Sequence, residues 1–259
     1  MYKIIKVTSK NRSELSSQLS NLKKQIVYPL GKSTFTIEHG NDYFAYYENM
    51  GKMHYWCVVK NGEVIGSACG IVKSLELGGR AWYLCDLKVD KNYRGQGIAR
   101  KLFRKIYLYM FIRYRIFRVY AISMNDPLNE GEGCKKLIYI SNNFLKEKGN
   151  LEFFLLTKEQ YVFYKQYLDE YSLTHTRGIK DIVFDRSSSG AEIYHLNRQK
   201  LSNITFEELP NDAYITISTY SKSELSKLFI HDGILPEGSA KVLTSYSAKN
   251  RPYIATDQV

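Results

Sequence analysis

Segments in which polar and apolar residues alternate, and segments with apolar residues at helical spacing, follow one another along the chain. Alternation over residues 2–7 predicts a strand, and apolar residues three or four positions apart over residues 15–26 predict an amphipathic helix that ends near Pro29. A second, shorter helix is expected around residues 42–49.

Two strands joined by a tight turn are predicted next. Residues 54–60 and 63–72 flank the dipeptide Asn61-Gly62, which accepts the positive φ values that a type I′ turn requires. We therefore expect these two segments to pair as an antiparallel hairpin.

A strand, a glycine-containing turn and a long helix follow the hairpin. Residues 81–89 predict a strand, residues 94–97 contain two glycines, and a helix is expected to continue to about Tyr114. The buried stripe of this helix is predicted to consist of Ile98, Leu102, Ile106 and Met110. Residues 117–124 then predict a returning strand.

The pattern is less regular downstream. A helix is expected over residues 134–144, an apolar strand over 151–156 and a further helix over 161–171. Beyond about residue 172 the pattern predicts strands at 181–185, 192–196 and 214–219, and a helix that begins at Ser223.

Composition and charge narrow the class of protein without selecting a function. With 44% hydrophobic residues and 5 prolines in 259 residues, the chain has the composition of an ordered globular protein. Lys and Arg exceed Asp and Glu by 37 − 26 = 11, so the surface is expected to attract anions such as nucleotides and phosphates. The 22 tyrosines fit a substrate cleft and also fit half-buried surface positions.

The cysteines and the start of the sequence favour a reducing, cytoplasmic location. The sequence has no CxxC pair and no histidine at metal-ligand spacing from a cysteine, so we expect reduced, mostly buried thiols and no metal site. The first residues alternate instead of forming the apolar core of a signal peptide, and no apolar run approaches the length of a membrane span. The cysteines are Cys57, Cys69, Cys85 and Cys134.

Residues 84–99 carry the sharpest chemical signal in the sequence. Gly95 and Gly97 let the backbone pass close to a ligand, and the first amides of the following helix have no intrahelical acceptor. Such a turn binds phosphate or pyrophosphate at the positive end of the helix dipole. The alternative is a strand-to-helix bend that uses glycine only for its geometry.

The turn fits a short motif in which Arg or Gln is followed three positions later by Gly and, two positions after that, by Gly or Ala. Its members here are Arg94, Gly97 and Ala99, and Leu87-x-Val89 precedes them. This string resembles the central motif of the GCN5-related N-acetyltransferase (GNAT) superfamily. The resemblance implies an α/β (mixed α+β) fold in which helices flank a central mixed β-sheet with a splayed strand pair. It implies acetyl-CoA as the cosubstrate, held by Leu87, Lys88, Val89, Arg94, Gly95, Gln96, Gly97, Ile98, Ala99 and Asn125. The nine basic and no acidic residues from Lys91 to Arg118 would favour the CoA phosphates, with a solvated helix face as the alternative.

A second correspondence lies downstream. The segment from Tyr139 to Phe144 is similar to the family's Tyr-x-x-x-Gly-Phe, with Asn143 in place of the glycine. The resemblance makes Tyr139 the candidate general acid, with a core tyrosine as the alternative. It makes Asn125 a candidate ligand of the pantetheine region or of water, with an ordinary turn residue as the alternative.

The general base is the weakest element of the pattern. Where many family members carry Glu or His, this chain has Cys85, and Asp86 is the nearest carboxylate. Strict alternation would point Asp86 away from a face shared by Cys85, Leu87 and Val89, unless the strand bulges. Asp86 is therefore the candidate base, and proton removal through a water chain is the alternative.

The resemblance places the amine acceptor at about residues 28–55. A cationic-amine pocket and a solvated helix face are both compatible with the residues that gather there. They are Glu38, His39, Asp42, Tyr43, Tyr46, Tyr47 and Glu48.

The implied function is acetyl transfer from acetyl-CoA to a primary amine by direct attack in a ternary complex. The alternatives are a non-catalytic CoA-binding domain of the same fold and, less favoured, a basic nucleic-acid-binding module. The acceptor is a small molecule or a protein amine, no membrane partner is expected, and a homodimer stays open. We assign residues 1–165 to the acetyltransferase domain and 166–259 to a C-terminal α/β extension, with a dimerisation element or a degenerate second half of similar fold as alternatives.

Overall fold

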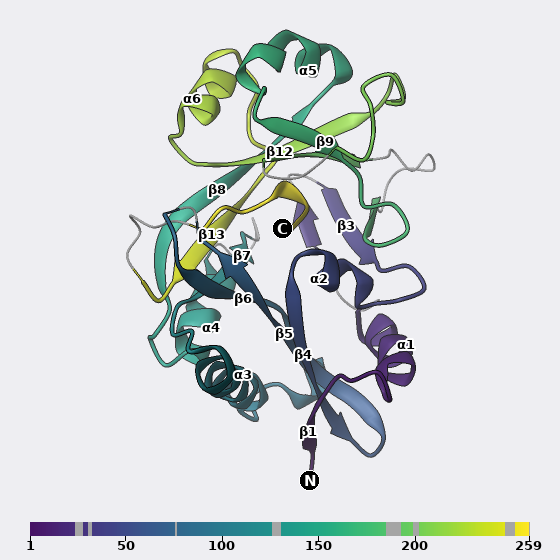
Figure 1. Cartoon of the computed structure of the whole chain (residues 1–259), viewed down its shortest axis with the longest axis vertical. Helices are drawn as coiled ribbons and strands as arrows, with labels where there is room; N and C mark the ends of the chain where they lie inside the picture. The colour runs from purple at the N-terminus through teal and green to yellow at the C-terminus, as the bar shows by residue number, and fades with distance from the viewer. Residues whose placement is uncertain are drawn as a thin grey trace.

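The computed structural model describes residues 1–23, 28–30, 33–75, 77–125, 131–184, 193–198, 202–246 and 252–258. In this part of the chain a 10-stranded mixed sheet runs through the whole molecule in the order β1-β4-β5-β6-β7-β13-β8-β12-β11-β9. A separate sheet has 3 strands in the order β10-β3-β2. Figure 1 shows the long sheet passing from the N-terminal half at the bottom to the C-terminal half at the top.

In its described residues, the first half of the chain supplies one end of the long sheet and four helices. Their bounds are β1 (Lys3–Lys6), α1 (Arg12–Lys23), α2 (Ala45–Asn49), β4 (Lys52–Lys60), β5 (Glu63–Ser74), β6 (Arg80–Val89), α3 (Ile98–Tyr114), β7 (Val119–Met124) and α4 (Glu132–Ile140). The strands and helices expected in this half are thus present, with boundaries shifted by a few residues. The predicted stripe of α3 is fully buried, since Ile98, Leu102, Ile106 and Met110 are at most 2% exposed.

The second half supplies the other end of the sheet. Its elements are β8 (Lys146–Leu156), α5 (Lys158–Tyr164), β9 (Tyr171–Thr174), β11 (Ile193–Arg198), β12 (Tyr214–Tyr220), α6 (Glu224–His231) and β13 (Gly238–Thr244). The small sheet joins β2 (Tyr28–Leu30) and β3 (Ser33–Glu38) to β10 (Asp181–Phe184). The sequence pattern did not indicate β2, β3, β9 or β13.

Two predicted helices end earlier than expected, for local reasons. Helix α4 stops at Ile140 and not at residue 144, because Asn142 and Asn143 adopt left-handed φ values of 57° and 61°. Helix α5 covers residues 158–164 in place of 161–171. The capping box of Thr157 and Gln160 fixes its early start, and the chain tightens into a 3₁₀ turn over Lys165–Tyr167 where it ends. A strand already begins at Tyr171.

Strand β13 connects the two halves of the chain. It lies between β7 and β8 and is antiparallel to both, so that Ala240 faces Met124 on one side and Leu151 on the other. Residues beyond 165 therefore complete the sheet that the first 165 residues begin. The segment between β8 and β13 forms the remaining strands β9, β11 and β12 and the helices α5 and α6.

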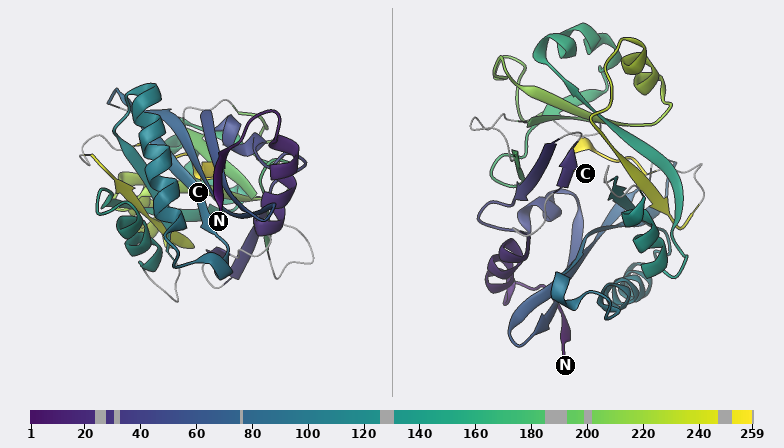
Figure 2. Two further views of the ribbon diagram at one scale, coloured as in Figure 1. Left: turned by 90° about the horizontal axis from the view of Figure 1, so that it is seen from below. Right: turned by 180° about the vertical axis from the view of Figure 1, so that it is seen from behind.

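Helices cover the N-terminal half of the sheet on both faces (Figure 2). Helices α3 and α4 pack on one face, around a core that includes Trp56, Trp82 and Leu102. Helices α1 and α2 pack on the opposite face, around a core that includes Leu19 and Tyr55. Helices α5 and α6 lie with β8 and β12 around a third core. We refer to the side of α1 and α2 as the α2 face and to the side of α3 and α4 as the α3 face.

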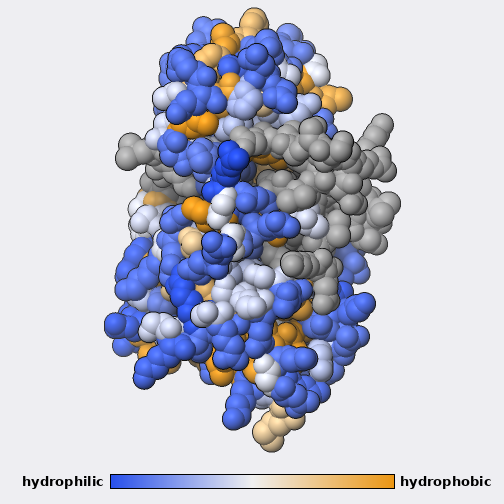
Figure 3. All heavy atoms as spheres, turned by 90° about the vertical axis from the view of Figure 1, so that its right-hand side faces the viewer, coloured by the Kyte–Doolittle hydropathy of each residue, from blue (hydrophilic) through white to orange (hydrophobic). Residues whose placement is uncertain are grey.

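The surface in Figure 3 is largely hydrophilic, with small separate hydrophobic areas over both halves of the molecule. Among the described helices, none combines the length and the apolar character that crossing a bilayer requires.

Candidate functional site

Strands β6 and β7 separate at the middle of the sheet. They run parallel and are paired only from Trp82 with Val119 to Leu84 with Ala121. Beyond that point β7 pairs with β13, whereas β6 continues to pair with β5 on its other side. The edge of β6 after Leu84 therefore has no partner strand within the described residues, and it provides main-chain groups for an extended ligand.

Asp86 forms a bulge in β6. Its φ is +51°, and the register with β5 shifts by one residue between the pair Cys69–Cys85 and the pair Ser67–Lys88. Cys85 consequently packs on the α2 face, while Leu87 and Val89 pack on the α3 face. The expectation that these three side chains share a face is wrong, because the extra residue reverses the alternation.

The bulge also sets the direction of the main chain at Leu87. The carbonyl oxygen of Asp86 accepts a hydrogen bond of 3.3 Å from Ser67 Oγ of β5. In a trans peptide the following N–H points the opposite way, so the amide of Leu87 is directed away from β5, toward the open edge. The carbonyl of Val89 faces the same edge and accepts a hydrogen bond of 3.2 Å from Arg94 Nε.

The glycine turn lies immediately beyond this edge. Gly95 and Gly97 have φ values of +80° and +71°, and a Cβ on either would meet no atom within 4 Å. Gly97 is the N-cap residue of α3 and provides no side-chain acceptor for the first amides of the helix. Arg94 and Gln96 are exposed beside these amides. The turn is therefore open to solvent and presents main-chain donors.

Two further predicted cofactor ligands lie at the start of α3. Ile98 is 2% exposed and anchors the helix in the core of the α3 face, whereas Ala99 is half-buried. Lys88 points to the opposite side of the sheet, where it is buried. The side chain of Lys88 is thus separated by the sheet from the turn.

Tyr139 lies on the outer surface of α4 near the start of α3. Its ring is 68% exposed, and the guanidinium of Arg100 lies 4.3 Å from the ring centroid. The interpretation of Tyr139 as a core tyrosine is therefore wrong. The hydroxyl is accessible on the same side of the sheet as the glycine turn.

Asn125 follows β7 and is tied to β13. Its amide N–H donates to the carbonyl of Ser239 at 2.9 Å, and its side-chain Nδ2 donates to Ser239 Oγ at 2.7 Å. These bonds hold the end of β7 against β13, on the side away from β6.

A buried ion pair occupies the α2 face at the bulge. Asp86 and Lys88 are 2.7 Å apart, with side chains only 4% and 6% exposed. Tyr43 donates a hydrogen bond of 2.7 Å to Asp86, and Tyr55 donates another. Burial raises the pKa of both tyrosines well above the usual value, and the negative charge of Asp86 adds to the effect. The carboxylate therefore accepts hydrogen bonds from three donors, one of which is a charged ammonium.

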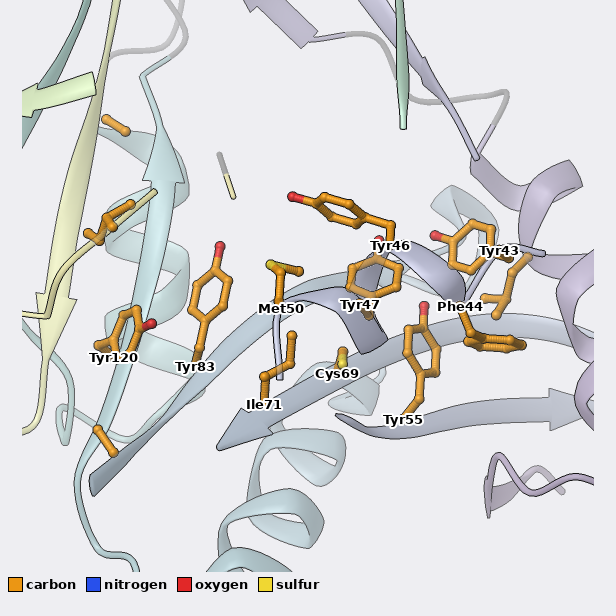
Figure 4. Close-up of a cluster of buried hydrophobic side chains, with 14 of the residues drawn as sticks. Tyr43, Phe44, Tyr46, Tyr47, Met50, Tyr55, Cys69, Ile71, Tyr83 and Tyr120 are labelled. Atoms are coloured by element: carbon orange, nitrogen blue, oxygen red, sulfur yellow. The ribbon is translucent and has the colours of Figure 1, made fainter. Parts of the chain in front are cut away.

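The aromatic residues of the predicted acceptor region gather beside this pair. Tyr43, Tyr46 and Tyr47 are buried, and their rings lie 4.5 to 5.6 Å from that of His39. Figure 4 shows the tyrosines of α2 facing Tyr55 of β4 and Tyr83 of β6. The acidic residues of the predicted acceptor region lie at the surface instead. Asp42 and Glu48 form ion pairs with Arg12, and Glu38 is exposed. The region therefore combines a buried aromatic cluster with a solvated acidic surface.

A further segment lies on this face and was not indicated by any sequence pattern. Residues 252–258 run across the α2 face, and Ile254, Ala255 and the residues to Gln258 are buried there. Tyr46 and Lys180 donate hydrogen bonds to the carbonyl oxygen of Asp257, and Tyr83 donates to that of Gln258.

The four cysteines are free thiols, three of them buried and Cys85 half-buried. Burial raises the pKa of Cys57 to about 12, which makes it a weak nucleophile. No group of three or more His, Cys, Asp or Glu side chains suited to a metal ion occurs in the part of the chain that the structure describes.

A family model for the acetyltransferase (GNAT) family matches residues 25–127. No curated protein matches the chain. Among solved structures, a tandem GNAT protein from the clavulanic acid biosynthesis pathway is similar over 95% of this chain and 99% of its own, with 9% identity and a TM-score of 0.54. An acetyltransferase of the GNAT family from Staphylococcus aureus covers 57% of this chain and 84% of its own, with 19% identity and a TM-score of 0.38. The structure of NAA60 of Arabidopsis thaliana in complex with acetyl-CoA is similar over 59% of this chain and 88% of its own, with 16% identity and a TM-score of 0.43.

The full-length structural similarity shows the fold, and the family match covers the open edge of β6, the bulge and the glycine turn. The chain is therefore similar to the acetyltransferase (GNAT) family over residues 25–127, the part that contains the open edge of β6 and the glycine turn.

Proposed function

We propose that the protein is an N-acetyltransferase that transfers the acetyl group of acetyl-CoA to a primary amine in a ternary complex. The observation that carries the proposal is the continuity of the unpaired edge of β6 with the open glycine turn at Gly95 and Gly97. An extended ligand that ends in a pyrophosphate matches these two features in order, because it needs main-chain partners along its arm and N–H donors at its charged end.

Two groups of residues would hold the cosubstrate. The main-chain amides of Gly97 and Ala99 at the start of α3, with the exposed side chains of Arg94 and Gln96 beside them, would bind the pyrophosphate. Leu87 and the following residues to Val89 would pair through their main chain with the pantetheine arm. We propose these contacts, together with a role for Asn125 at the end of β7, as the cofactor site.

The reaction needs a polarised carbonyl, a base and an acid. The amide of Leu87, directed toward the open edge, would donate to the thioester oxygen and stabilise the negative charge that develops there. The amine nitrogen forms a bond to the carbonyl carbon, the carbon–sulfur bond breaks, and Tyr139 would protonate the departing thiolate. The second proton, which the nitrogen loses as the amide forms, would return to Tyr139 through solvent. We propose Asp86 as the acceptor of the ammonium proton, directly or through a bound water.

A second candidate function, a non-catalytic CoA-binding domain, is favoured by one observation. The carboxylate of Asp86 already accepts from Lys88, Tyr43 and Tyr55. These three donors occupy the carboxylate oxygens that would otherwise accept the proton of a substrate ammonium. Thiol release from acetyl-CoA in the presence of an amine excludes this candidate.

Calorimetric titration with acetyl-CoA tests the proposal. Wild-type protein should bind, whereas Gly97→Trp should not, because the indole fills the space in front of the helix amides. Gly233→Trp is the matched control, since Gly233 also has a positive φ, of +83°, and open surroundings, but lies beyond α6. If wild type does not bind acetyl-CoA, or if both variants bind as it does, the proposed site is wrong.

A further inference from the structure

The segment 252–258 contacts both halves of the molecule. Figures 1 and 2 show the C-terminal end of the chain enclosed between α2, the small sheet and the second half of the long sheet. Apart from a short 3₁₀ turn over Thr256–Gln258, it is irregular and adds no strand to either sheet. Its interactions are therefore made residue by residue.

Thr256 makes most of the hydrogen bonds that attach the segment to the second half, and the hydroxyls of Tyr220 and Ser218 on β12 add one each, to the carbonyls of Pro252 at 3.1 Å and of Ile254 at 3.5 Å. The amide of Thr256 donates to Asn197 Oδ1 at 2.6 Å, and Thr256 Oγ1 donates to the carbonyl of Leu196 at 2.9 Å. Thr256 Oγ1 also accepts a hydrogen bond from the amide of Ser218 at 2.9 Å. Thr256 thus fixes the segment to β11 and β12.

Its contacts on the α2 face are of a different kind. Lys180 Nζ donates to the carbonyl of Asp257 at 3.0 Å, the hydroxyl of Tyr46 donates to the same oxygen, and the hydroxyl of Tyr83 donates to the carbonyl of Gln258 at 3.2 Å. All three donors recognise main-chain carbonyls of consecutive residues. The buried side-chain oxygen Oε1 of Gln258 has no hydrogen-bond partner among the described residues. The site therefore recognises a polypeptide backbone and does not select this side chain.

The position of these donors connects them with the proposed reaction. Tyr83 lies two residues before Cys85 on the same face of β6. Tyr46 is in ring contact with Tyr47 at 5.1 Å, and Tyr43 of the same cluster donates to Asp86. Figure 4 shows the hydroxyls of Tyr46 and Tyr83 directed toward one region of this face. The carbonyls of the segment thus lie on the acceptor side of the bulge.

We propose that Tyr46, Tyr83 and Lys180 form a binding site for the main chain of a polypeptide acceptor, and that residues 252–258 occupy this site as a tethered competitor. The inference rests on the proposed acetyltransferase function and adds the class of acceptor. Since main-chain carbonyls are common to all peptides, the site tolerates different sequences, and an extended acceptor binds only after the segment has withdrawn.

Loosening the segment at its other attachment tests the proposal. Thr256→Val keeps the side-chain shape but removes the hydrogen bonds that Oγ1 makes with the carbonyl of Leu196 and with the amide and hydroxyl of Ser218, without changing the three donors. Loss of these hydrogen bonds should raise the withdrawn fraction at least roughly 5-fold. A fluorescent, N-acetylated synthetic peptide of residues 252–258, which has no free amine, should therefore bind this variant at least roughly fivefold more tightly than it binds wild type.

The controls separate this inference from the proposed function. In the double variant Thr256→Val with Tyr83→Phe the peptide should bind more weakly than in Thr256→Val alone. If the peptide binds wild type and Thr256→Val equally, or binds neither, while both bind acetyl-CoA, the inference is wrong and the acetyltransferase function is unaffected. If wild type does not bind acetyl-CoA, the proposed function fails, whatever the peptide does.

Hydrogen exchange on wild type gives a test that needs no variant. The amides of Thr256 and Gln258 are hydrogen-bonded, to Asn197 Oδ1 and to the carbonyl of Ala255. A competitor that withdraws should exchange these amides through local opening, at least roughly tenfold faster than the amides of the β5–β6 ladder. Equal protection would show a fixed structural segment and overturn the proposal.

Discussion

The buried pair of Asp86 and Lys88 provides the strongest test of the site geometry. Both side chains are almost fully buried, at 4% and 6% exposed, and they are 2.7 Å apart. Asp86→Asn removes the charge but keeps an acceptor for Tyr43 and Tyr55, and it leaves the ammonium of Lys88 without its counter-charge. Lys88→Met leaves the carboxylate with the two hydroxyls alone.

Breaking a buried pair on one side typically costs about 3–5 kcal/mol, because a desolvated charge remains. For a chain of this size that corresponds to a decrease in the melting temperature of roughly 6–20 °C. The double variant should lose about 0.5–3 kcal/mol less than the sum of the single variants, because it leaves no unpaired charge. Urea unfolding at neutral pH measures all three free energies.

A surface pair in the same molecule is the control. Lys227 and Glu224 are also 2.7 Å apart, but their side chains are 60% and 92% exposed. Lys227→Met should therefore leave the melting temperature nearly unchanged, because solvent screens exposed pairs. If the variants of the buried pair behave like this control, or if the two single effects simply add, the pair is not desolvated in solution and the described bulge is wrong.

The Asp86→Asn variant also tests the proposed role of the carboxylate. If Asp86 accepts the ammonium proton, turnover should decrease by roughly 10²–10⁴-fold while acetyl-CoA binding is retained. If turnover persists in folded protein, proton transfer occurs through water, and Asp86 serves to hold Tyr43 and Tyr55 in place.

Three further predictions follow from other parts of the structure. If Tyr139 protonates the thiolate, Tyr139→Phe should lower kcat by roughly 10²–10⁴-fold and leave the acetyl-CoA affinity unchanged. Tyr167→Phe, at another exposed tyrosine, should have no effect. Stopped assays of thiol release measure kcat for both variants. Burial and the nearby Lys6, Lys52 and Arg113 lower the pKa of His54 to about 4, so the unfolded chain binds more protons than the folded chain at acidic pH. The free energy of unfolding should therefore decrease by about 2–3 kcal/mol as the pH falls from 7 to 4. Urea unfolding should show this pH dependence in wild type and its loss in His54→Phe. Gly70→Ala should destabilise by roughly 1–3 kcal/mol in thermal unfolding, because its Cβ would lie 2.9 Å from Ile106 Cγ2 where α3 packs on β5.

Features encoded in short segments could be predicted from the sequence. Asn61 and Gly62 adopt the φ values of +52° and +84° that a type I′ turn requires. The turn residues Gly95 and Gly97 have the positive φ values that motivated their interpretation as a ligand cradle. In each case the local conformation depends on the residue type itself. The start of α5 was missed although Thr157 and Gln160 carried a readable capping signal.

Features that depend on distant partners could not be predicted in this way. Strand β13 is specified by pairing with β7, more than 100 residues earlier, so its short apolar pattern alone gave no placement. The segment 252–258 has no periodicity and is positioned by Asn197, Tyr46 and Tyr83 from separate parts of the chain. Only the folded sheet brings these partners together.

The bulge at Asp86 shows why the site was only partly predictable. A non-glycine residue at φ +51° is unfavourable in isolation, and nothing in the local sequence requires it. The ion pair with Lys88 and the hydrogen bonds from Tyr43 and Tyr55 stabilise that conformation, so residues on three separate elements determine one dihedral angle. That angle has two effects: it turns Cys85 and Asp86 toward the acceptor side, and it directs the amide of Leu87 toward the open edge. Any change that relaxes the bulge should therefore disturb the acceptor side and the thioester side of the site together.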